Sequence, residues 1–201
     1  MAVKVDIEEV KRLKDLTGAG LTDAKKALED ASGDFDVALD EMRKKGLTKA
    51  EKRAEREASE GVVATYNHDS RIGVVVELNC ETSFVAKTEE FKTLAQDIAM
   101  HIVASNPEFI SSDDIPEEIR QEKAKEFKDK VVAEGKPADI AENIVQGMLK
   151  KYFAERCMLD QPFVKDQDKT VGDLVKGNIA KLGENIVVRK MARVELGQRN
   201  G

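Results

Sequence analysis

The stretch RIGVVVELNCETSFVAKTEEF, residues 71–91, contains the change from strand to helix on which the fold depends. Its first ten residues are rich in β-branched side chains and predict a strand. The segment KTEEF predicts a helix start, because Thr88 can serve as the N-cap and two glutamates follow it. A single helix through residues 84–91 would place Phe84 and Phe91 on one buried face, whereas a helix that begins at Thr88 leaves Phe84 on an exposed turn. The residues alone leave both alternatives open.

Two further segments predict partners for this strand. GVVATYNH, residues 61–68, is joined to it by the turn-forming pair Asp-Ser and predicts a β-hairpin. NIVVRKMARVEL, residues 185–196, predicts a third strand, so the economical arrangement is a three-stranded antiparallel sheet. Alternation places Glu77 and Asn79 on the solvent face. The expected core-facing residues are Ile72, Val74, Val76, Leu78 and Cys80, with Ile186, Val188, Ala192, Val194 and Leu196 sharing one face of the last strand.

Helical patterns fill the interval between the second and third strands. Residues 89–105 form an amphipathic helix in which His101 lies beside the apolar stripe, where a structural histidine is favoured over a catalytic base. Residues 111–135 are highly charged and predict an exposed helix or hairpin arm. Residues 137–161 predict a stronger amphipathic helix, and residues 168–183 a last helix that ends at Gly183. The core-facing residues of the first helix are expected to be Phe91, Leu94, Ala95, Ile98, Ile102 and Val103.

Residues 4–45 predict three short helices. Asp6, Thr22 and Asp34 are the expected N-terminal capping residues, and Gly46 is the expected end of the third helix. The apolar positions of these helices are Ile7, Val10, Leu13, Leu16, Phe35, Ala38, Leu39 and Met42. The predicted fold class is therefore α+β. It consists of an N-terminal three-helix domain (1–45), a charged helical linker (46–60) and a core domain (61–201) of a three-stranded antiparallel sheet packed with helices.

Composition excludes several classes of function. The net charge of −6 argues against a dedicated nucleic-acid binder, so no direct nucleic-acid partner is expected. The two cysteines, Cys80 and Cys157, form no CxxC pair and lie at no ligand spacing to the two histidines, so no metal site is predicted. The sequence has no apolar run long enough for a membrane span and no signal-peptide pattern, which predicts a cytoplasmic protein without a membrane partner.

Catalytic motifs are missing from the sequence. It contains no GxxxxGK[ST], GxGxxG, GxSxG or HExxH pattern. The glycine-rich segment TGAGLTDAKKAL lacks the preceding strand and the Gly-Lys-Ser/Thr ending of a phosphate loop, so a turn between two helices is favoured. We therefore expect a protein that is not an enzyme, has no cofactor and functions by binding.

Several long motifs, in the same order, resemble the elongation factor Ts family of guanine-nucleotide exchange factors. They are TGAGLTDAKKAL (17–28), NCETSFVAKTEEF (79–91), DIAMHIVASNPEF (97–109), QPFVKDQDKTVGDLV (161–175) and AKLGENIVVRKMARVELG (180–197). The resemblance spans nearly the whole chain. It implies that the first three helices are similar to a ubiquitin-associated module. With a single core unit, the chain is similar to the short form of the family, for which a homodimer bound to two copies of elongation factor Tu is implied.

The resemblance also implies a mechanism. The family signature Thr-Asp-Phe-Val corresponds to Thr82, Ser83, Phe84 and Val85. In the family, the phenylalanine enters a crevice in the GTPase domain of elongation factor Tu bound to GDP, disturbs the magnesium site and promotes GDP release, so that the nucleotide-free state is stabilised. This favours an exposed Phe84. Ser83 replaces the family aspartate; serine can still cap a turn but carries no charge.

Other partner-binding positions are implied by the resemblance alone. Leu21, Thr22 and Lys25 match the surface with which the family's N-terminal domain binds the GTPase domain. Leu182 and Gly183 match a turn that approaches the partner's phosphate loop. His68, at the predicted hairpin tip, matches a contact to another domain of the partner.

Two rival hypotheses remain. Residues 4–45 alone would suit a peptide- or nascent-chain-binding protein that uses the ubiquitin-associated-like module. A dimer that has kept the family fold without exchange activity would follow if Ser83 has inactivated the signature.

Overall fold

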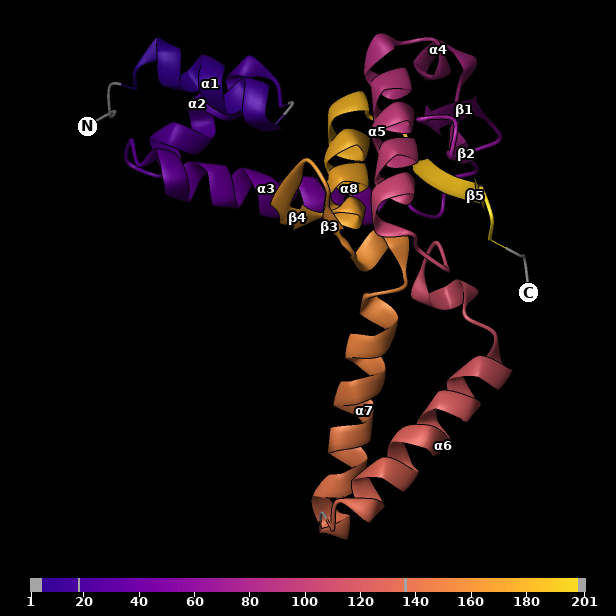
Figure 1. The fold of residues 1–201 in the computed structure, drawn as a ribbon. Coiled ribbons are helices and arrows are strands. Elements are labelled where there is room, and N and C mark those ends of the chain that lie inside the picture. The colour runs from indigo at the N-terminus through magenta and orange to yellow at the C-terminus, as the bar shows by residue number, and fades with distance from the viewer. Residues whose placement is uncertain (1–4, 18, 136, 199–201) are drawn as a thin grey trace.

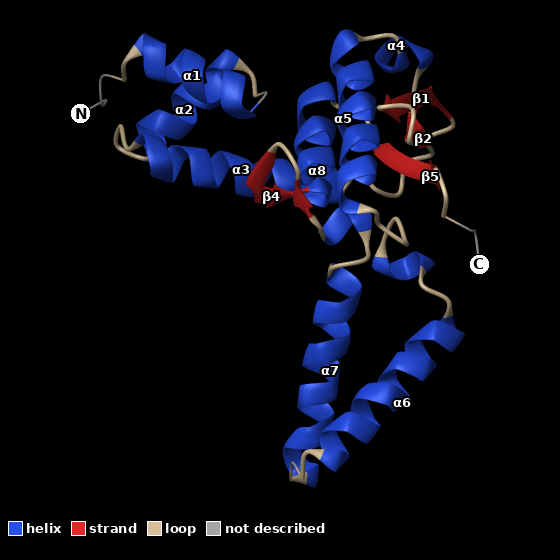
Figure 2. Ribbon diagram, in the orientation of Figure 1, coloured by secondary structure: helices blue, strands red, loops and turns tan. Residues whose placement is uncertain are grey.

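The computed structural model describes residues 5–17, 19–135 and 137–198 (Figures 1 and 2). Three helices at the N-terminus precede a small sheet that is packed with helices, and two long helices project from this core (Figure 1). The α+β class predicted from the sequence is confirmed. The division into domains at residues 45 and 60 stays a prediction.

The main sheet contains the three predicted strands. β1 (Glu60–His68), β2 (Ile72–Cys80) and β5 (Ile186–Glu195) lie in the order β1-β2-β5, and both neighbouring pairs are antiparallel. Asp69 and Ser70 form the hairpin turn with positive φ angles of 49° and 57°. The side chain of Asn67 accepts a hydrogen bond from the Ser70 amide at 2.9 Å, which stabilises this turn.

A β-bulge in the last strand changes which residues face the core. Glu77 pairs with Lys190 and Leu78 pairs with Val188, so Arg189 is an extra residue on β5. Beyond the bulge Met191 packs against the core, whereas Val194 and Leu196 are 64% and 67% exposed. The expected alternation was therefore right for Ile186 and Val188 and wrong for Ala192, Val194 and Leu196.

The solvent face of β2 also departs from the expectation. Asn79 is buried at 7% exposure, although its position in the alternation predicted contact with water. It pairs with Gly61 of β1 and Val187 of β5 at the end of the sheet that lies away from the β1–β2 turn. Ala58 is buried, and its carbonyl accepts a hydrogen bond from Arg189 at 3.1 Å. The chain before β1 therefore folds back over this end of the sheet.

Helices cover one face of the sheet and form the core with it (Figure 2). α5 (Glu89–Ser105) packs on β1 and β2, and α8 (Val171–Leu182) packs on β5 and α5. A short hairpin of β3 (Pro162–Phe163) and β4 (Asp166–Thr170), which the sequence did not predict, precedes α8. The predicted core residues of α5 are all buried: Phe91, Leu94, Ala95, Ile98, Ile102 and Val103.

His101 is a structural residue, as predicted. It is fully buried, and its Nε2 lies 2.9 Å from Oε1 of Gln161. Its Nδ1 accepts a hydrogen bond from the Val164 amide at 3.3 Å. The two contacts join α5 to the β3–β4 hairpin, and burial lowers the pKa of the imidazole.

The three N-terminal helices enclose a second, smaller core. α1 (Ile7–Thr17), α2 (Leu21–Asp30) and α3 (Phe35–Glu51) pack on one another. Ile7 and Leu16 share the helical spacing of Val10 and Leu13 but are 54% and 57% exposed. The N-cap of α2 is Gly20 and not Thr22. The fully or nearly buried residues are Val10, Leu13, Ala24, Ala27, Leu28, Ala38 and Met42.

The third helix does not end at Gly46, as expected, but continues to Glu51. A Cβ atom at Gly46 would lie 3.5 Å from the Cβ of Ala180, an ordinary van der Waals distance, so α3 lies directly against α8 at this position. Ala50, further along α3, is buried in the main core. Tertiary packing against α8 therefore stabilises helical structure where the glycine alone predicted its end.

A helical arm extends away from the sheet (Figure 1). α6 (Glu117–Ala133) is the exposed helix that was one of the two alternatives for residues 111–135, and it packs on α7 (Ala138–Ala154), the predicted amphipathic helix. Within the described part of the chain, no helix is long and apolar enough to span a bilayer.

Candidate partner-binding site

Phe84 projects from a turn at the end of the central strand. β2 ends at Cys80, and the single-turn helix α4 (Ser83–Ala86) follows. Phe84 is 86% exposed, whereas Ala86 is buried and Val85 packs against the core. The turn is therefore anchored by Val85 and Ala86 and presents the phenylalanine ring to solvent. The exposed alternative for Phe84 is confirmed.

A new helix begins four residues after Phe84, as the sequence predicted. Thr88 is the N-cap of α5, and its Oγ1 accepts a hydrogen bond from the Phe91 amide at 3.3 Å. Phe91 is fully buried under the sheet. The two phenylalanines consequently belong to different helices and have opposite environments.

A carboxylate from a distant segment holds the start of the Phe84 turn. Oε2 of Glu184 accepts hydrogen bonds from the amides of Glu81 and Thr82 at 3.1 and 3.0 Å. Oε1 accepts a third from the Thr82 hydroxyl at 2.6 Å. The same hydroxyl oxygen accepts from the Val85 amide at 3.4 Å and so caps α4. One carboxylate thus fixes both the backbone and the capping side chain of this turn.

A second set of contacts joins the same two segments with the donor and acceptor roles exchanged. Oε1 of Glu81 accepts a hydrogen bond from the Asn185 amide at 2.6 Å and lies 3.5 Å from Nη1 of Arg56. The side-chain amide of Asn185 donates to the carbonyls of Ala54 and Arg56 at 3.2 and 2.7 Å. The connection between α3 and β1 is therefore hydrogen-bonded to the segment that supports the turn. We call Glu81, Thr82, Glu184 and Asn185 the clasp.

Leu182 and Gly183 lie beside this turn. Gly183 is the C-cap of α8 with a φ of 80°, a left-handed conformation that glycine adopts without strain. Glu184 of the clasp follows it directly. The structure thus brings together two groups that the sequence placed a hundred residues apart: residues 82–85 and residues 182–183.

His68 lies at the other end of the central hairpin. It is the last residue of β1, whereas the Phe84 turn follows the last residue of β2. Nine strand residues separate the two ends, about 30 Å at about 3.3 Å per residue. The imidazole is exposed and stacks on Tyr66 with the ring centroids 6.2 Å apart. His68 and Phe84 can therefore contact a single partner only if it spans the sheet.

Leu21, Thr22 and Lys25 form a separate exposed group on α2. Leu21 is 48% exposed, and Lys25 forms an i,i+4 ion pair with Glu29 at 3.7 Å. In Figure 1, α2 and α4 lie at opposite sides of the molecule, with α8 and α5 between them. The site residues predicted from the sequence therefore form three groups: the Phe84 turn with residues 182–183, the tip of the hairpin, and α2.

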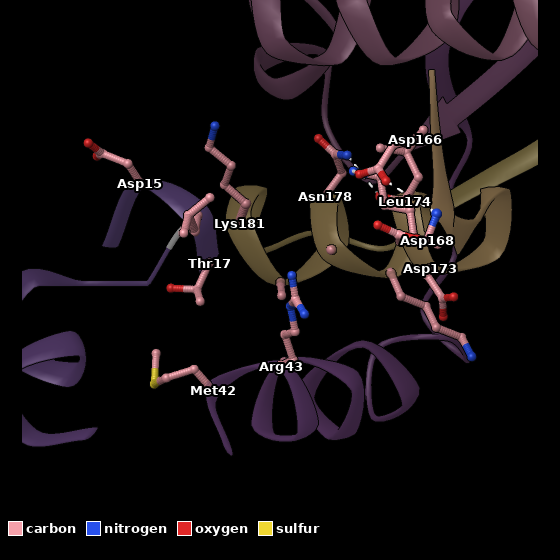
Figure 3. Close-up of a pocket in the computed structure, with 16 residues that line it drawn as sticks. Asp15, Thr17, Met42, Arg43, Asp166, Asp168, Asp173, Leu174, Asn178 and Lys181 are labelled. Atoms are coloured by element: carbon pink, nitrogen blue, oxygen red, sulfur yellow. Dashed lines mark hydrogen bonds and ion pairs between the residues drawn. The ribbon is translucent and has the colours of Figure 1, made fainter. Parts of the chain in front are cut away.

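A cavity of about 470 Å³ is lined by residues of α1 and α3 on one side and of α8 and β4 on the other (Figure 3). Its wall carries charges of both signs, such as Arg43, Asp168 and Lys176. Asp166 pairs with Lys169 at 2.8 Å, and this hydrogen bond lowers the pKa of the carboxyl. Among the described residues, no group of three or more histidine, cysteine or acidic side chains is arranged to hold a metal ion. The cavity thus offers neither a metal centre nor a uniformly charged ligand site.

Comparison with known proteins identifies the family. The sequence profile of the family Elongation factor TS matches residues 6–198. The chain belongs to this family. Elongation factor Ts of Syntrophomonas wolfei is 51% identical over 195 residues, which cover 96% of this chain and 91% of that protein. Elongation factor Ts of Thermodesulfovibrio yellowstonii is 50% identical over 194 residues, with 96% and 97% covered. That of Moorella thermoacetica is 49% identical over 191 residues, with 94% of each covered.

In this member of the Elongation factor TS family, sequence reasoning missed the clasp. Glu81 directly precedes the signature, and Glu184 and Asn185 directly follow the C-cap glycine of α8. Polar residues at the end of one strand and the start of another were the available signal. Their partners are 102 to 131 residues away, however, so local patterns could not identify the contacts.

Proposed function

We propose that this protein is the guanine-nucleotide exchange factor of elongation factor Tu. It binds elongation factor Tu in complex with GDP, promotes release of GDP and stabilises the nucleotide-free state. The family match over residues 6–198 supports this role, because it covers the core as well as the N-terminal helices. A role limited to peptide binding by the three-helix module would leave the match across the core unexplained.

The observation that carries the mechanism is the exposure of Phe84. An aromatic side chain that is 86% exposed on an otherwise anchored turn has nearly its whole surface available to a partner. A rigid ring loses little rotamer entropy on binding, which makes it an effective anchor. Phe84 acts as the wedge in the GTPase domain, and Thr82, Ser83 and Val85 shape the turn that presents it.

Exchange by this route is a binding equilibrium and breaks no covalent bond. By linkage, the factor weakens GDP binding by the same coupling free energy by which GDP weakens binding of the factor. The protein therefore needs no cofactor, and we assign it no enzymatic activity. Its place of action is the cytoplasm, where elongation factor Tu functions.

Further contacts extend the interface around the wedge. Leu182 and Gly183, next to the Phe84 turn, approach the phosphate-loop side of the partner. Leu21, Thr22 and Lys25 bind the GTPase domain from α2, and His68 contacts a second domain of the partner. The separation of these three groups suits a large partner that is contacted at several points.

A homodimer that binds two copies of elongation factor Tu is part of this proposal. The face of the sheet opposite the helices exposes Val63, Val75 and Val194 to 66%, 44% and 64%, and Leu196 adjoins it at 67%. Exposed apolar side chains gathered on one sheet face are typical of an interaction surface. This face is the proposed interface between the two copies.

Sedimentation velocity tests the dimer. Val194→Glu introduces a charge into the proposed interface and is expected to yield monomers at concentrations at which the wild type is dimeric. Val132→Glu, at a 63% exposed position of the arm, is the matched control and is expected to leave the dimer intact. A dimer that persists in Val194→Glu would contradict this interface.

The exchange function is tested by release of a fluorescent GDP analogue from purified elongation factor Tu, with excess unlabelled GDP present. The release rate is expected to rise with the concentration of the factor and to saturate. A rate that does not depend on the factor would refute the proposal and support the alternative of a family fold without exchange activity.

A further inference from the structure

Glu184, which follows the C-cap of α8, accepts three hydrogen bonds from residues 81 and 82 at the start of the Phe84 turn. Its two carboxylate oxygens accept from the Glu81 amide, the Thr82 amide and the Thr82 hydroxyl, at 2.6–3.1 Å. Hydrogen bonds to a carboxylate are about twice as strong as those between neutral groups. The carboxylate therefore restricts the backbone two residues before Phe84.

The turn needs such support because α4 has only four residues. A helix this short is unstable alone, because the first helical turn fixes several residues for a single hydrogen bond. The cap from Thr82 to the Val85 amide is long at 3.4 Å. Since the Thr82 hydroxyl donates its proton to Glu184, its oxygen lone pairs remain available to the Val85 amide.

The clasp is reciprocal, which makes it more rigid than a single contact. Glu184 accepts from the amides of residues 81 and 82, while Glu81 accepts from the amide of Asn185 at 2.6 Å. Arg56 lies 3.5 Å from Glu81 and offsets the negative charge of that carboxylate. The segment after α8 and the segment after β2 thus hold each other at the N-terminal side of the Phe84 turn.

We propose that Glu184 is a positioning residue that holds the Phe84 turn in the conformation that elongation factor Tu binds. This inference rests on the proposed exchange function. Without the carboxylate, residues 81–85 sample more conformations in the free protein. Ordering them on binding then opposes association, whereas the wedge itself is unchanged once bound.

The expected kinetic signature differs from that of the wedge. Glu184→Ala is expected to raise the half-saturating concentration of the factor about three- to tenfold, which corresponds to the ordering of about one side chain. The maximal rate of GDP release stays at the wild-type value. Phe84→Ala, by contrast, removes the wedge and lowers the maximal rate.

The experiment compares Glu184→Ala with Glu184→Gln and Glu126→Ala. The glutamine variant keeps a carbonyl oxygen that can accept from the two amides, so its half-saturating concentration is expected to lie between wild type and Glu184→Ala. Glu126→Ala removes an equal charge from an exposed ion pair with Lys123 on the arm, and is expected to behave as wild type. Amide hydrogen exchange of Glu81 and Thr82, measured by NMR without the partner, is expected to accelerate in Glu184→Ala and to stay slower in Glu184→Gln.

The outcomes separate this inference from the exchange function. If wild type does not accelerate GDP release, the proposed nucleotide-exchange function is refuted. The hydrogen-exchange rates of the Glu81 and Thr82 amides then still decide whether Glu184 holds the turn. Active wild type with an unchanged half-saturating concentration in Glu184→Ala overturns the positioning role. A lowered maximal rate with an unchanged half-saturating concentration also overturns it, because Glu184 would then act on the partner directly. Should Glu184→Ala fail to fold, Glu184→Gln decides the question by the same two measurements.

Discussion

Replacement of Phe84 by alanine tests the central argument most directly. The side chain of a phenylalanine offers about 200 Å² for burial. At 86% exposure, about 170 Å² of it is available to a partner, which at about 25 cal/mol/Å² sets an upper limit of about 4 kcal/mol. The remaining methyl group of alanine reduces the expected loss to about 2–3 kcal/mol. This corresponds to about a 30- to 150-fold loss in the stimulated rate of GDP release.

The same substitution is expected to leave the fold intact. Because the ring is exposed in the free protein, its removal should change the free energy of unfolding by no more than about 0.5 kcal/mol. Phe91→Ala is the matched control, since it removes the same side chain from a fully buried position seven residues away. That variant is expected to lose about 3–5 kcal/mol of stability.

The assay combines two measurements on each variant. Release of a fluorescent GDP analogue from elongation factor Tu reports exchange, and urea denaturation followed by circular dichroism reports stability. Phe84→Ala with retained exchange and wild-type stability would refute the wedge. A loss of several kcal/mol of stability in Phe84→Ala would instead show that the turn is part of the core.

Three other predictions concern stability and reactivity. Burial lowers the pKa of His101 below its unfolded value of about 6.5, so the unfolded chain binds more protons than the folded protein below that pH. The free energy of unfolding should therefore keep its full value above about pH 6.5 and fall on acidification by at most about 1.4 kcal/mol per pH unit. Urea denaturation between pH 5 and 7.5 would show this dependence. A pH-independent free energy of unfolding in this range would contradict it. Burial raises the pKa of Cys157 to about 11 and also raises that of Cys80. Both thiols should therefore resist alkylation by iodoacetamide at pH 8 in the native state and react after unfolding. Rapid labelling of the native protein would contradict this prediction. Thr170→Ala removes the capping box with Asp173 at the start of α8 and should lower the free energy of unfolding by about 1 kcal/mol; an unchanged urea midpoint would show that this cap contributes nothing.

Local patterns in the sequence predicted the elements well where the signals are short-range. The Thr88 cap separates α4 from α5, and Gly183 ends α8, as expected. Both signals act through hydrogen bonds or backbone angles within a few residues. Two errors occurred where contacts between distant residues determine the structure. Gly46 lies inside α3 because the helix packs on α8, and the bulge at Arg189 reverses the faces of β5 beyond it.

The candidate site shows the same division. Family motifs in the sequence identify Thr82, Ser83, Phe84 and Val85 as a unit, but the residues around Phe84 are compatible with either a buried or an exposed ring. The fold places the ring in solvent, because Val85 and Ala86 pack inward when α4 and α5 form separate helices.

The sequence was sufficient for the three strands of the main sheet, several helix ends and the family, because periodicity, capping and motif order are properties of neighbouring residues. The support of the Phe84 turn by Glu184, more than a hundred residues later, follows from tertiary structure. A carboxylate in a sequence can accept a hydrogen bond from any donor that folding brings within reach. The identity of that donor is settled only when α8 packs on the sheet and sets Gly183 beside the end of β2.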